Sequence, residues 1–229
     1  SITETVSACS ILPLMRIGDE LGLFAALAEA GPCSCQAFAD AAGIDERYAR
    51  EWLHALCAAG YCSHDDAFET FHLSAEQQAV LADEESKALM IGASDSLVGN
   101  VHGIEAITEA FKTGEGVDYG DFHQCVFQGT ARFFKPSYKS NLLEKWMPKI
   151  PAATEKRENG GRLCDVGCGK GLSTLLMAEH YPNASFVGID IHAPSIDEAN
   201  EEAHLAGLSD RLCYDAADAE SYGGEYDVI

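Results

Sequence analysis

Hydrophobic residues recur three or four positions apart from Leu14 to Leu27, which predicts one amphipathic helix that ends before Gly31. Ser34 is placed to cap a second, short helix, and Asp45 is placed to cap a third. Side-chain oxygens at such positions accept hydrogen bonds from the first N–H groups of a helix, which have no partner inside it. The chain therefore begins with three predicted helices.

A β-hairpin is predicted after the third helix, because residues 61–63 and 70–73 flank a polar tip at 64–66. The third helix has one apolar stripe, which consists of Tyr48, Trp52, Leu53, Leu56 and Ala59. Three helices followed by a hairpin are typical of a winged helix, which we assign to residues 1–82.

The next segment, residues 83–158, is expected to be a helical connector and a substrate cap. Apolar residues keep helical spacing over 84–112, where three glycines can bend or break the helix. Residues 114–135 are rich in glycine and aromatic side chains and have weak periodicity, so we expect a loop-rich cap over a pocket. Pro136 is expected to open a new helix at its first turn.

Strands and helices alternate in residues 159–229. Short apolar strands are predicted at 162–166, 185–190 and 212–217, with helices between them, and a fourth begins at residue 226. This alternation predicts an α/β fold with a Rossmann-like, doubly wound sheet, of which the chain holds the first four strands. The mainly α winged-helix domain precedes it.

A glycine-rich turn joins the first of these strands to a helix that begins at Leu172. Gly167, Gly169 and Gly171 lack Cβ atoms, so the backbone can approach a ligand closely at this turn. The dinucleotide fingerprint requires its third glycine where this chain has Leu172, which argues against a pyrophosphate site and an NAD-dependent oxidoreductase. The P-loop spacing is also absent.

Carboxylates follow the next two strands. Asp190 ends the second strand, where it can accept hydrogen bonds from both hydroxyls of an unphosphorylated ribose. Asp218 follows the third strand and can accept from an exocyclic adenine amine, while the N–H of Ala219 can donate to a ring nitrogen. Asp215 and Ala216 repeat this pair three positions earlier and stay an alternative. The sequence therefore predicts a nucleoside site along one crevice.

Residues 165–171, 187–190, 217–219 and 226–229 resemble, in order and spacing, the motifs of class I S-adenosylmethionine-dependent methyltransferases. The resemblance implies that S-adenosyl-L-methionine is the cofactor and that its methyl group goes to an acceptor. The cofactor-binding residues that it implies are Asp165, Gly167, Cys168, Gly169, Gly171, Asp190, Ile191, Asp218 and Ala219.

Each of these residues has an implied role. The loop residues 167–171 lie against the methionyl end, and Asp165 reaches the amino group directly or through water. Asp190 binds the ribose and Ile191 packs on adenine, whose edge is read by Asp218 and Ala219. Methyl transfer from a sulfonium needs mainly alignment and exclusion of water, so we nominate no catalytic residue.

The upstream half is similar, more loosely, to the winged-helix domain of small-molecule methyltransferases. That resemblance implies dimerisation and substrate covering, so we expect a small-molecule methyl acceptor and a homodimer through the N-terminal domain. The alternative is an inactive nucleoside-binding regulator whose winged helix contacts a partner or DNA. His192 is a candidate for the pocket, and Phe133, Phe134 and Tyr138 are candidates for the acceptor pocket, for contact with the sulfonium or for core packing.

Charge and cysteine content narrow the partners further. The chain has 15 Lys and Arg against 37 Asp and Glu, a formal charge of −22, which disfavours nucleic acid and anionic membranes. No apolar stretch approaches the roughly 20 residues of a membrane-spanning helix. Nine cysteines show no disulfide framework, and Cys33 with Cys35 lacks the second pair of a zinc site. We expect a cytoplasmic protein without a metal, and a chain that is a fragment.

Overall fold

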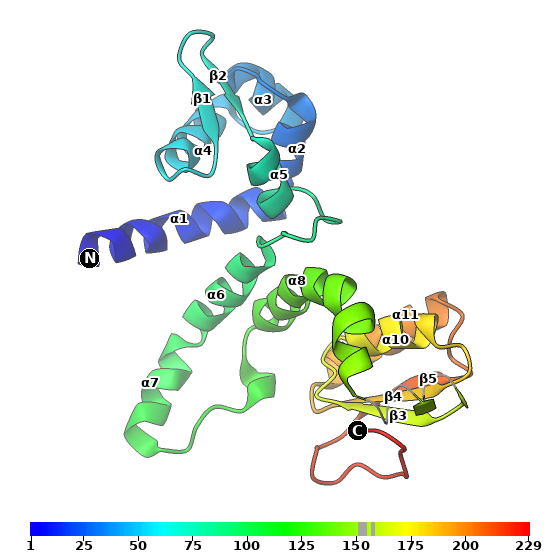
Figure 1. The fold of residues 1–229 in the computed structure, drawn as a ribbon. Coiled ribbons are helices and arrows are strands. Elements are labelled where there is room, and N and C mark those ends of the chain that lie inside the picture. The colour runs from blue at the N-terminus through cyan, green and yellow to red at the C-terminus, as the bar shows by residue number, and fades with distance from the viewer. Residues whose placement is uncertain (151–154, 157–158) are drawn as a thin grey trace. The chain divides into compact units, whose positions relative to one another are not determined.

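The computed structural model describes residues 1–150, 155–156 and 159–229. These residues form two compact units, Ser1–Val101 and His102–Ile229 (Figure 1). Each unit has a hydrophobic core of its own.

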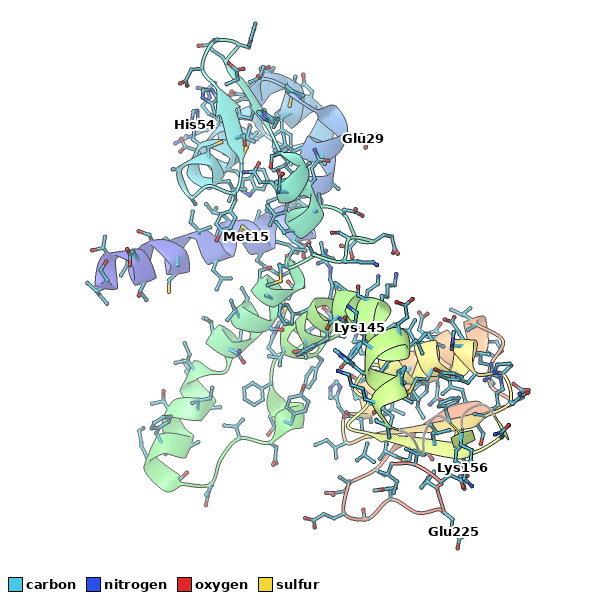
Figure 2. All side chains as sticks on the ribbon, in the orientation of Figure 1. Met15, Glu29, His54, Lys145, Lys156 and Glu225 are labelled. Atoms are coloured by element: carbon cyan, nitrogen blue, oxygen red, sulfur yellow. The ribbon has the colours of Figure 1, made fainter. Side chains whose placement is uncertain are left out.

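Two helices, α1 (Ile2–Glu20) and α2 (Leu23–Ala30), replace the single helix that the apolar pattern predicts. Gly22 between them has a φ of 67°, a left-handed conformation that glycine adopts without the steric cost of a Cβ atom. The apolar spacing continues across this break because both helices pack on the same core, which Met15 of α1 also contacts (Figure 2). The one-helix prediction was therefore wrong.

The helices α3 (Cys35–Ala42) and α4 (Glu46–Ala58) begin at the predicted caps. The Ser34 hydroxyl and the Asp45 carboxylate each accept a hydrogen bond from an N–H group of the first turn. Tyr48, which is 73% exposed, and Ala59 lie outside the buried stripe, so those two predictions were wrong. The buried residues of α4 are Ala49, Trp52, Leu53 and Leu56.

The strands β1 (Ser63–Asp65) and β2 (Thr70–His72) form an antiparallel hairpin, as predicted, and α5 (Ala75–Leu81) follows it. The predicted tip at 64–66 was wrong in part, because residues 64 and 65 belong to β1. The ring of Trp52 lies in the core of this unit. It stacks on Phe38, with ring centroids 5.7 Å apart, and lies tilted against Phe24, with ring centroids 5.1 Å apart. Helices α2 to α4 and the hairpin thus form the predicted winged helix.

The predicted connector contains α6 (Gly92–His102) and α7 (Ile104–Thr113), which Gly103 separates. Residues 84–91 form turns and loops instead of the helix that their spacing predicts. The end of the connector, at residues 151–154 and 157–158, lies outside the described residues. No helix in the described part of the chain is both long enough and apolar enough to span a membrane.

A long helix, α8 (Gln124–Asn141), lies where a loop-rich cap is predicted. Only residues 114–123 are irregular, with a 3₁₀ turn at Tyr119–Asp121 (η1), and Pro136 lies inside the helix instead of opening one. An interior proline removes one helical hydrogen bond. Burial of one face offsets that loss, because Val126, Phe127 and Pro136 are all buried. A π-helical turn, Leu142–Trp146 (η2), and a 3₁₀ turn, Met147–Lys149 (η3), follow.

The α/β part of the second unit contains three parallel strands in the order β3-β4-β5. The helices α10 and α11 connect them and cover one face of the sheet (Figure 1). The elements are β3 (Arg162–Val166), α10 (Leu172–His180), β4 (Ser185–Asp190), α11 (Ala193–Leu205) and β5 (Leu212–Ala216).

The predicted fourth strand is present only as one parallel bridge, between Val228 and Leu163. The N–H of Cys164 donates to the Val228 carbonyl at 2.9 Å. This segment therefore lies on the side of β3 opposite to β4, as the strand order of a Rossmann-like sheet requires. The predicted fold class is confirmed.

Candidate functional site

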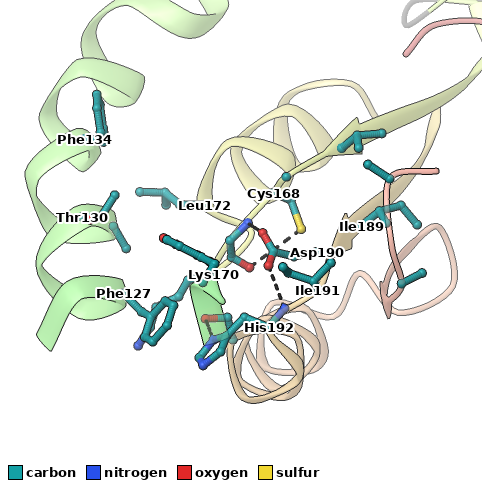
Figure 3. A pocket seen from close by; sticks show the side chains of 18 of the residues that line it. Phe127, Thr130, Phe134, Cys168, Lys170, Leu172, Ile189, Asp190, Ile191 and His192 are labelled. Atoms are coloured by element: carbon teal, nitrogen blue, oxygen red, sulfur yellow. Dashed lines mark hydrogen bonds between the residues drawn. The ribbon is translucent and has the colours of Figure 1, made fainter. Parts of the chain in front are cut away.

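The carboxyl ends of β3 and β4 and the segment after β5 border a cavity of about 370 Å³ (Figure 3). Its volume falls in the range of small-molecule sites, roughly 300–1,000 Å³. The loop after β3 and the residues that follow β4 and β5 form one side, while α8 and η1 contribute the other. Ligands of open α/β sheets bind at this end of the strands.

The three glycines of the loop after β3 have different surroundings. All have positive φ, at 79° for Gly167, 55° for Gly169 and 73° for Gly171. A Cβ atom on Gly167 or Gly169 would meet no atom within 4 Å, and both residues line the cavity. A Cβ atom on Gly171 would lie 2.4 Å from the ring of Tyr214, and Gly171 does not line it. The first two glycines therefore leave room for a ligand, whereas Gly171 leaves room for a protein side chain.

The N–H groups of this loop are already used by the protein. Gly167 and Cys168 both donate to the carbonyl of Ile189, at 2.7 and 3.0 Å, and Gly169 donates to Oδ2 of Asp190 at 2.9 Å. Phosphate-binding loops present such N–H groups to the ligand instead. The loop therefore supports the prediction against a pyrophosphate, and Leu172 lies on the cavity wall.

Asp190, at the end of β4, projects its carboxylate toward the cavity (Figure 3). Besides the bond from Gly169, its Oδ1 accepts from the N–H of His192 at 2.9 Å. These two bonds fix the carboxylate against the backbone. Each carboxylate oxygen has a further lone pair, so the group can still accept hydrogen bonds from a diol. Ile191 beside it also lines the cavity and is 56% exposed.

Asp165 and Asp218 lie outside the cavity lining. Oδ2 of Asp165 accepts hydrogen bonds from the hydroxyls of Ser173 and Thr174, both at 2.7 Å. Asp218 is exposed, and its carboxylate accepts from the N–H of Glu220 in the turn after β5. Its alternative, Asp215, lies inside β5 and does not line the cavity either.

Ala219 lines the cavity together with Ala217. The structure thus brings six of the predicted residues to one surface, and it holds the other three behind or beside that surface. The six are Gly167, Cys168, Gly169, Asp190, Ile191 and Ala219.

Aromatic side chains from α8 and η1 form the opposite wall. Phe127 stacks on the imidazole of His192, with ring centroids 3.7 Å apart and planes 12° apart, and Tyr119 meets Phe127 edge-on at 5.0 Å. Phe134 and Tyr138 also line the cavity, whereas Phe133 does not. Sequence periodicity does not single out Phe127 or Tyr119. The aromatic density of residues 114–135 was the available signal.

Among the described residues, the acidic and basic side chains that line the cavity are Asp190 and Lys170. Burial raises the pKa of the Cys168 thiol, and the carboxylates of Asp165 and Asp190 raise it further, so this residue is a thiol and not a nucleophilic thiolate. Burial, and then the charge of Asp190, also raises the pKa of Tyr119. The one lysine on the cavity wall, Lys170, is paired with Glu198.

No group of three or more His, Cys, Asp and Glu side chains in the described ranges could hold a metal ion. The groups that could contact a ligand are the Asp190 carboxylate, the loop backbone and the aromatic wall.

Two segments of the chain match known protein families. Residues 8–83 match the Rv2258c-like winged HTH domain, and residues 157–229 match a methyltransferase domain. The tRNA (guanine-N(7)-)-methyltransferase of Acinetobacter baylyi is 42% identical over 52 residues, or 23% of this chain and 21% of that protein. The match thus spans about a fifth of this relative's length.

Solved structures with this fold align with almost the whole chain. A presumed O-methyltransferase from Nostoc punctiforme aligns with a TM-score of 0.70 at 24% identity, over 99% of this chain and 67% of that one. Human N-acetylserotonin methyltransferase, crystallised with S-adenosylmethionine, aligns with a TM-score of 0.59 at 14% identity, over 95% and 65% of the two chains. The chain therefore contains a segment that matches a winged helix-turn-helix domain, followed by a segment that matches a methyltransferase domain, and it shares the fold of these solved structures.

Proposed function

We propose that the protein transfers a methyl group from S-adenosyl-L-methionine to a small-molecule acceptor. One observation supports this most directly. The cavity at the strand ends joins a carboxylate after β4 to two glycines whose missing Cβ atoms leave open space beside it. The carboxylate can accept hydrogen bonds from the hydroxyls of a ribose. The open space beside the glycines can hold the part of a ligand that runs past the loop.

The residues present fit this cofactor. The Asp190 carboxylate would accept hydrogen bonds from the ribose hydroxyls, and Ile191 would cover the adenine. Gly167 and Gly169 would lie against the methionyl end, where Asp165 sits behind the loop and would reach an amino group through water. The negative charge of both carboxylates complements a cofactor that bears an ammonium and a sulfonium group.

The bound cofactor would supply an electrophilic methyl group on a sulfonium centre. The chain's own contribution is to orient the two reactants and to exclude water. The wall made by Tyr119, Phe127 and Tyr138 is suited to both, because its rings pack on one side of the cavity opposite Asp190. No residue of this wall needs to act as a base in the proposal.

The charge of the chain supports a small molecule as the acceptor in preference to a nucleic acid. The formal charge of −22 repels a phosphate backbone. In α4, the helix that would enter a DNA groove, Arg50 is paired with Glu46. The homodimer through the N-terminal domain and the cytoplasmic location stay predictions, and light scattering of the purified protein would test the first.

Calorimetry on the full-length gene product tests the proposed function. We expect S-adenosylhomocysteine to bind and labelled S-adenosylmethionine to donate its methyl group to a member of a small-molecule panel. Binding without transfer to any acceptor would favour the nucleoside-binding regulator. Absence of binding would overturn the assignment of this cavity to the cofactor.

A further inference from the structure

Tyr214 of β5 is a buried side chain that contacts the glycine loop without lining the cavity. It is 4% exposed. Its ring occupies the space that Cβ atoms on two glycines would need, since these would lie 2.4 Å from the ring at Gly171 and 2.2 Å at Gly188. The ring therefore packs directly on the backbone of the loop after β3 and on the backbone of β4. A shift of Tyr214 would move that loop.

The hydroxyl of Tyr214 adds a hydrogen bond to this packing. It donates a hydrogen bond to the carbonyl of Gly171 at 2.7 Å. Gly171 is the N-cap residue of α10, and Thr174 lies in the first turn of that helix. Thr174 is fully buried, and its own hydroxyl donates to Oδ2 of Asp165 at 2.7 Å. Two separate buried hydrogen bonds, from Tyr214 to Gly171 and from Thr174 to Asp165, thus lie at the start of α10.

The backbone of Tyr214 is held in place from the other side by Asn200 of α11. The N–H of Tyr214 donates to the Asn200 side-chain oxygen at 3.0 Å, and the Asn200 amide donates back to the Tyr214 carbonyl at 2.8 Å. These two bonds act like a strand partner for β5 at this position. Burial also raises the pKa of Tyr214, so its hydroxyl keeps its proton and stays a donor at neutral pH.

We propose that Tyr214 is a positioning residue for the methionyl end of the cofactor site. It holds Gly171 through its ring and hydroxyl, and Gly171 is the N-cap residue of α10, whose Ser173 and Thr174 hydroxyls bind the Asp165 carboxylate. This inference rests on the proposed function, because it assigns Asp165 and the loop to the amino acid part of S-adenosylmethionine. It predicts an effect that is specific to that part of the ligand.

The test compares two ligands that share the adenosyl group. S-adenosylhomocysteine carries the amino acid part, and 5′-methylthioadenosine lacks it. Tyr214→Phe keeps the ring and removes one buried hydrogen bond, so we expect the Kd for S-adenosylhomocysteine to rise about three- to tenfold. The Kd for 5′-methylthioadenosine should stay at the wild-type value. Both are measured by calorimetry on the full-length protein.

Two further variants provide a second test and a matched control. Thr174→Val removes a hydroxyl that donates to Asp165 from the first turn of α10, the helix that Gly171 caps, and should show the same ligand selectivity. Tyr181→Phe is the matched control, because it removes the hydroxyl of another buried tyrosine in the same core, beyond the far end of α10. It should change neither Kd.

The outcomes separate the two proposals. If wild-type protein binds neither ligand, the proposed function fails. If wild-type protein binds both, and Tyr214→Phe either leaves both Kd values unchanged or raises them equally, the positioning role fails while the proposed function stands. A selective loss of S-adenosylhomocysteine affinity supports both.

Discussion

At the scale of single residues, Asp190 is the group on which ligand affinity should depend most. Asp190→Asn keeps one oxygen acceptor but loses the charge that strengthens its hydrogen bonds. Hydrogen bonds to charged groups contribute about 1.5–3 kcal/mol, so we expect the Kd for S-adenosylhomocysteine to rise about ten- to hundredfold in calorimetry. Asp197→Asn, which changes an exposed carboxylate on α11, is the control. An unchanged Kd for Asp190→Asn would contradict the ribose assignment.

Two glycines two positions apart should respond differently to the same substitution. Both Gly169→Ala and Gly171→Ala force a left-handed conformation, which costs about 1–2 kcal/mol. Gly171→Ala also drives a Cβ atom into Tyr214, so its total loss of unfolding free energy should be roughly 2–5 kcal/mol. Gly169→Ala instead places its methyl group in the cavity and should weaken ligand binding. Urea denaturation and calorimetry measure the two effects, and equal stability losses would refute the distinction.

Cys168 should resist alkylation although it borders the cavity. Its pKa is raised, so as pH rises through the neutral range the thiol stays protonated and the reactive thiolate is scarce. Cys9 is exposed and serves as the internal reference. Peptide mass spectrometry after iodoacetamide treatment near pH 8 should find Cys9 labelled well before Cys168. Comparable labelling rates would show that the thiol is ionised or accessible.

What the sequence could predict of the site follows from how local each signal is. The strands fix the positions of residues at or just after their carboxyl ends, so the sequence predicts Asp190, Gly167 and Gly169 at the site, and all three line the cavity. Spacing does not reveal which face a loop residue presents. That is why Gly171, which packs on Tyr214, was grouped with glycines that face the cavity.

At the scale of elements, α8 is a helix whose first part the sequence pattern does not predict. Gly129 is a poor helix former, and proline is tolerated at a helix start but not inside a helix, so the sequence predicts a loop up to residue 135 and a helix that begins at Pro136. The helix forms because its buried face packs against other parts of the second unit, a contribution that a local propensity does not contain. The strand β4 and the helix α10 have the predicted limits because glycine and polar residues mark their ends in the sequence itself.

The contact of α8 with the cavity can be tested through Phe127. Phe127→Ala removes a buried ring that stacks on His192, so we expect a loss of about 3–5 kcal/mol of unfolding free energy. Amide exchange within α8 should also become faster, because the helix loses a main anchor. Phe133→Ala on the same helix is the control, since Phe133 is only partly buried and does not line the cavity. Equal exchange rates in the two variants would show that the stack does not hold α8.

At the scale of the whole molecule, net charge separates the two readings of the winged helix. Specific and non-specific DNA binding both depend on cations that displace counterions from phosphates. The chain has a formal net charge of −22. In the first unit, the guanidinium group of Arg16 forms an ion pair with the carboxylate of Asp95 at 3.0 Å. We therefore expect a labelled DNA duplex to show no anisotropy change with the full-length protein between about 50 and 200 mM salt.

A charge variant makes that prediction sharper. Glu46→Gln with Glu51→Gln removes two acidic side chains from α4 and frees Arg50 from its partner while leaving the buried stripe intact. If charge alone prevents binding, this variant should gain weak affinity that falls steeply with salt, whereas the wild type stays unbound. If the wild type instead binds DNA, and its affinity falls with salt as the release of several counterions requires, then the winged helix contacts phosphates. In that case the regulator reading would gain support, even if the cavity still binds S-adenosylhomocysteine.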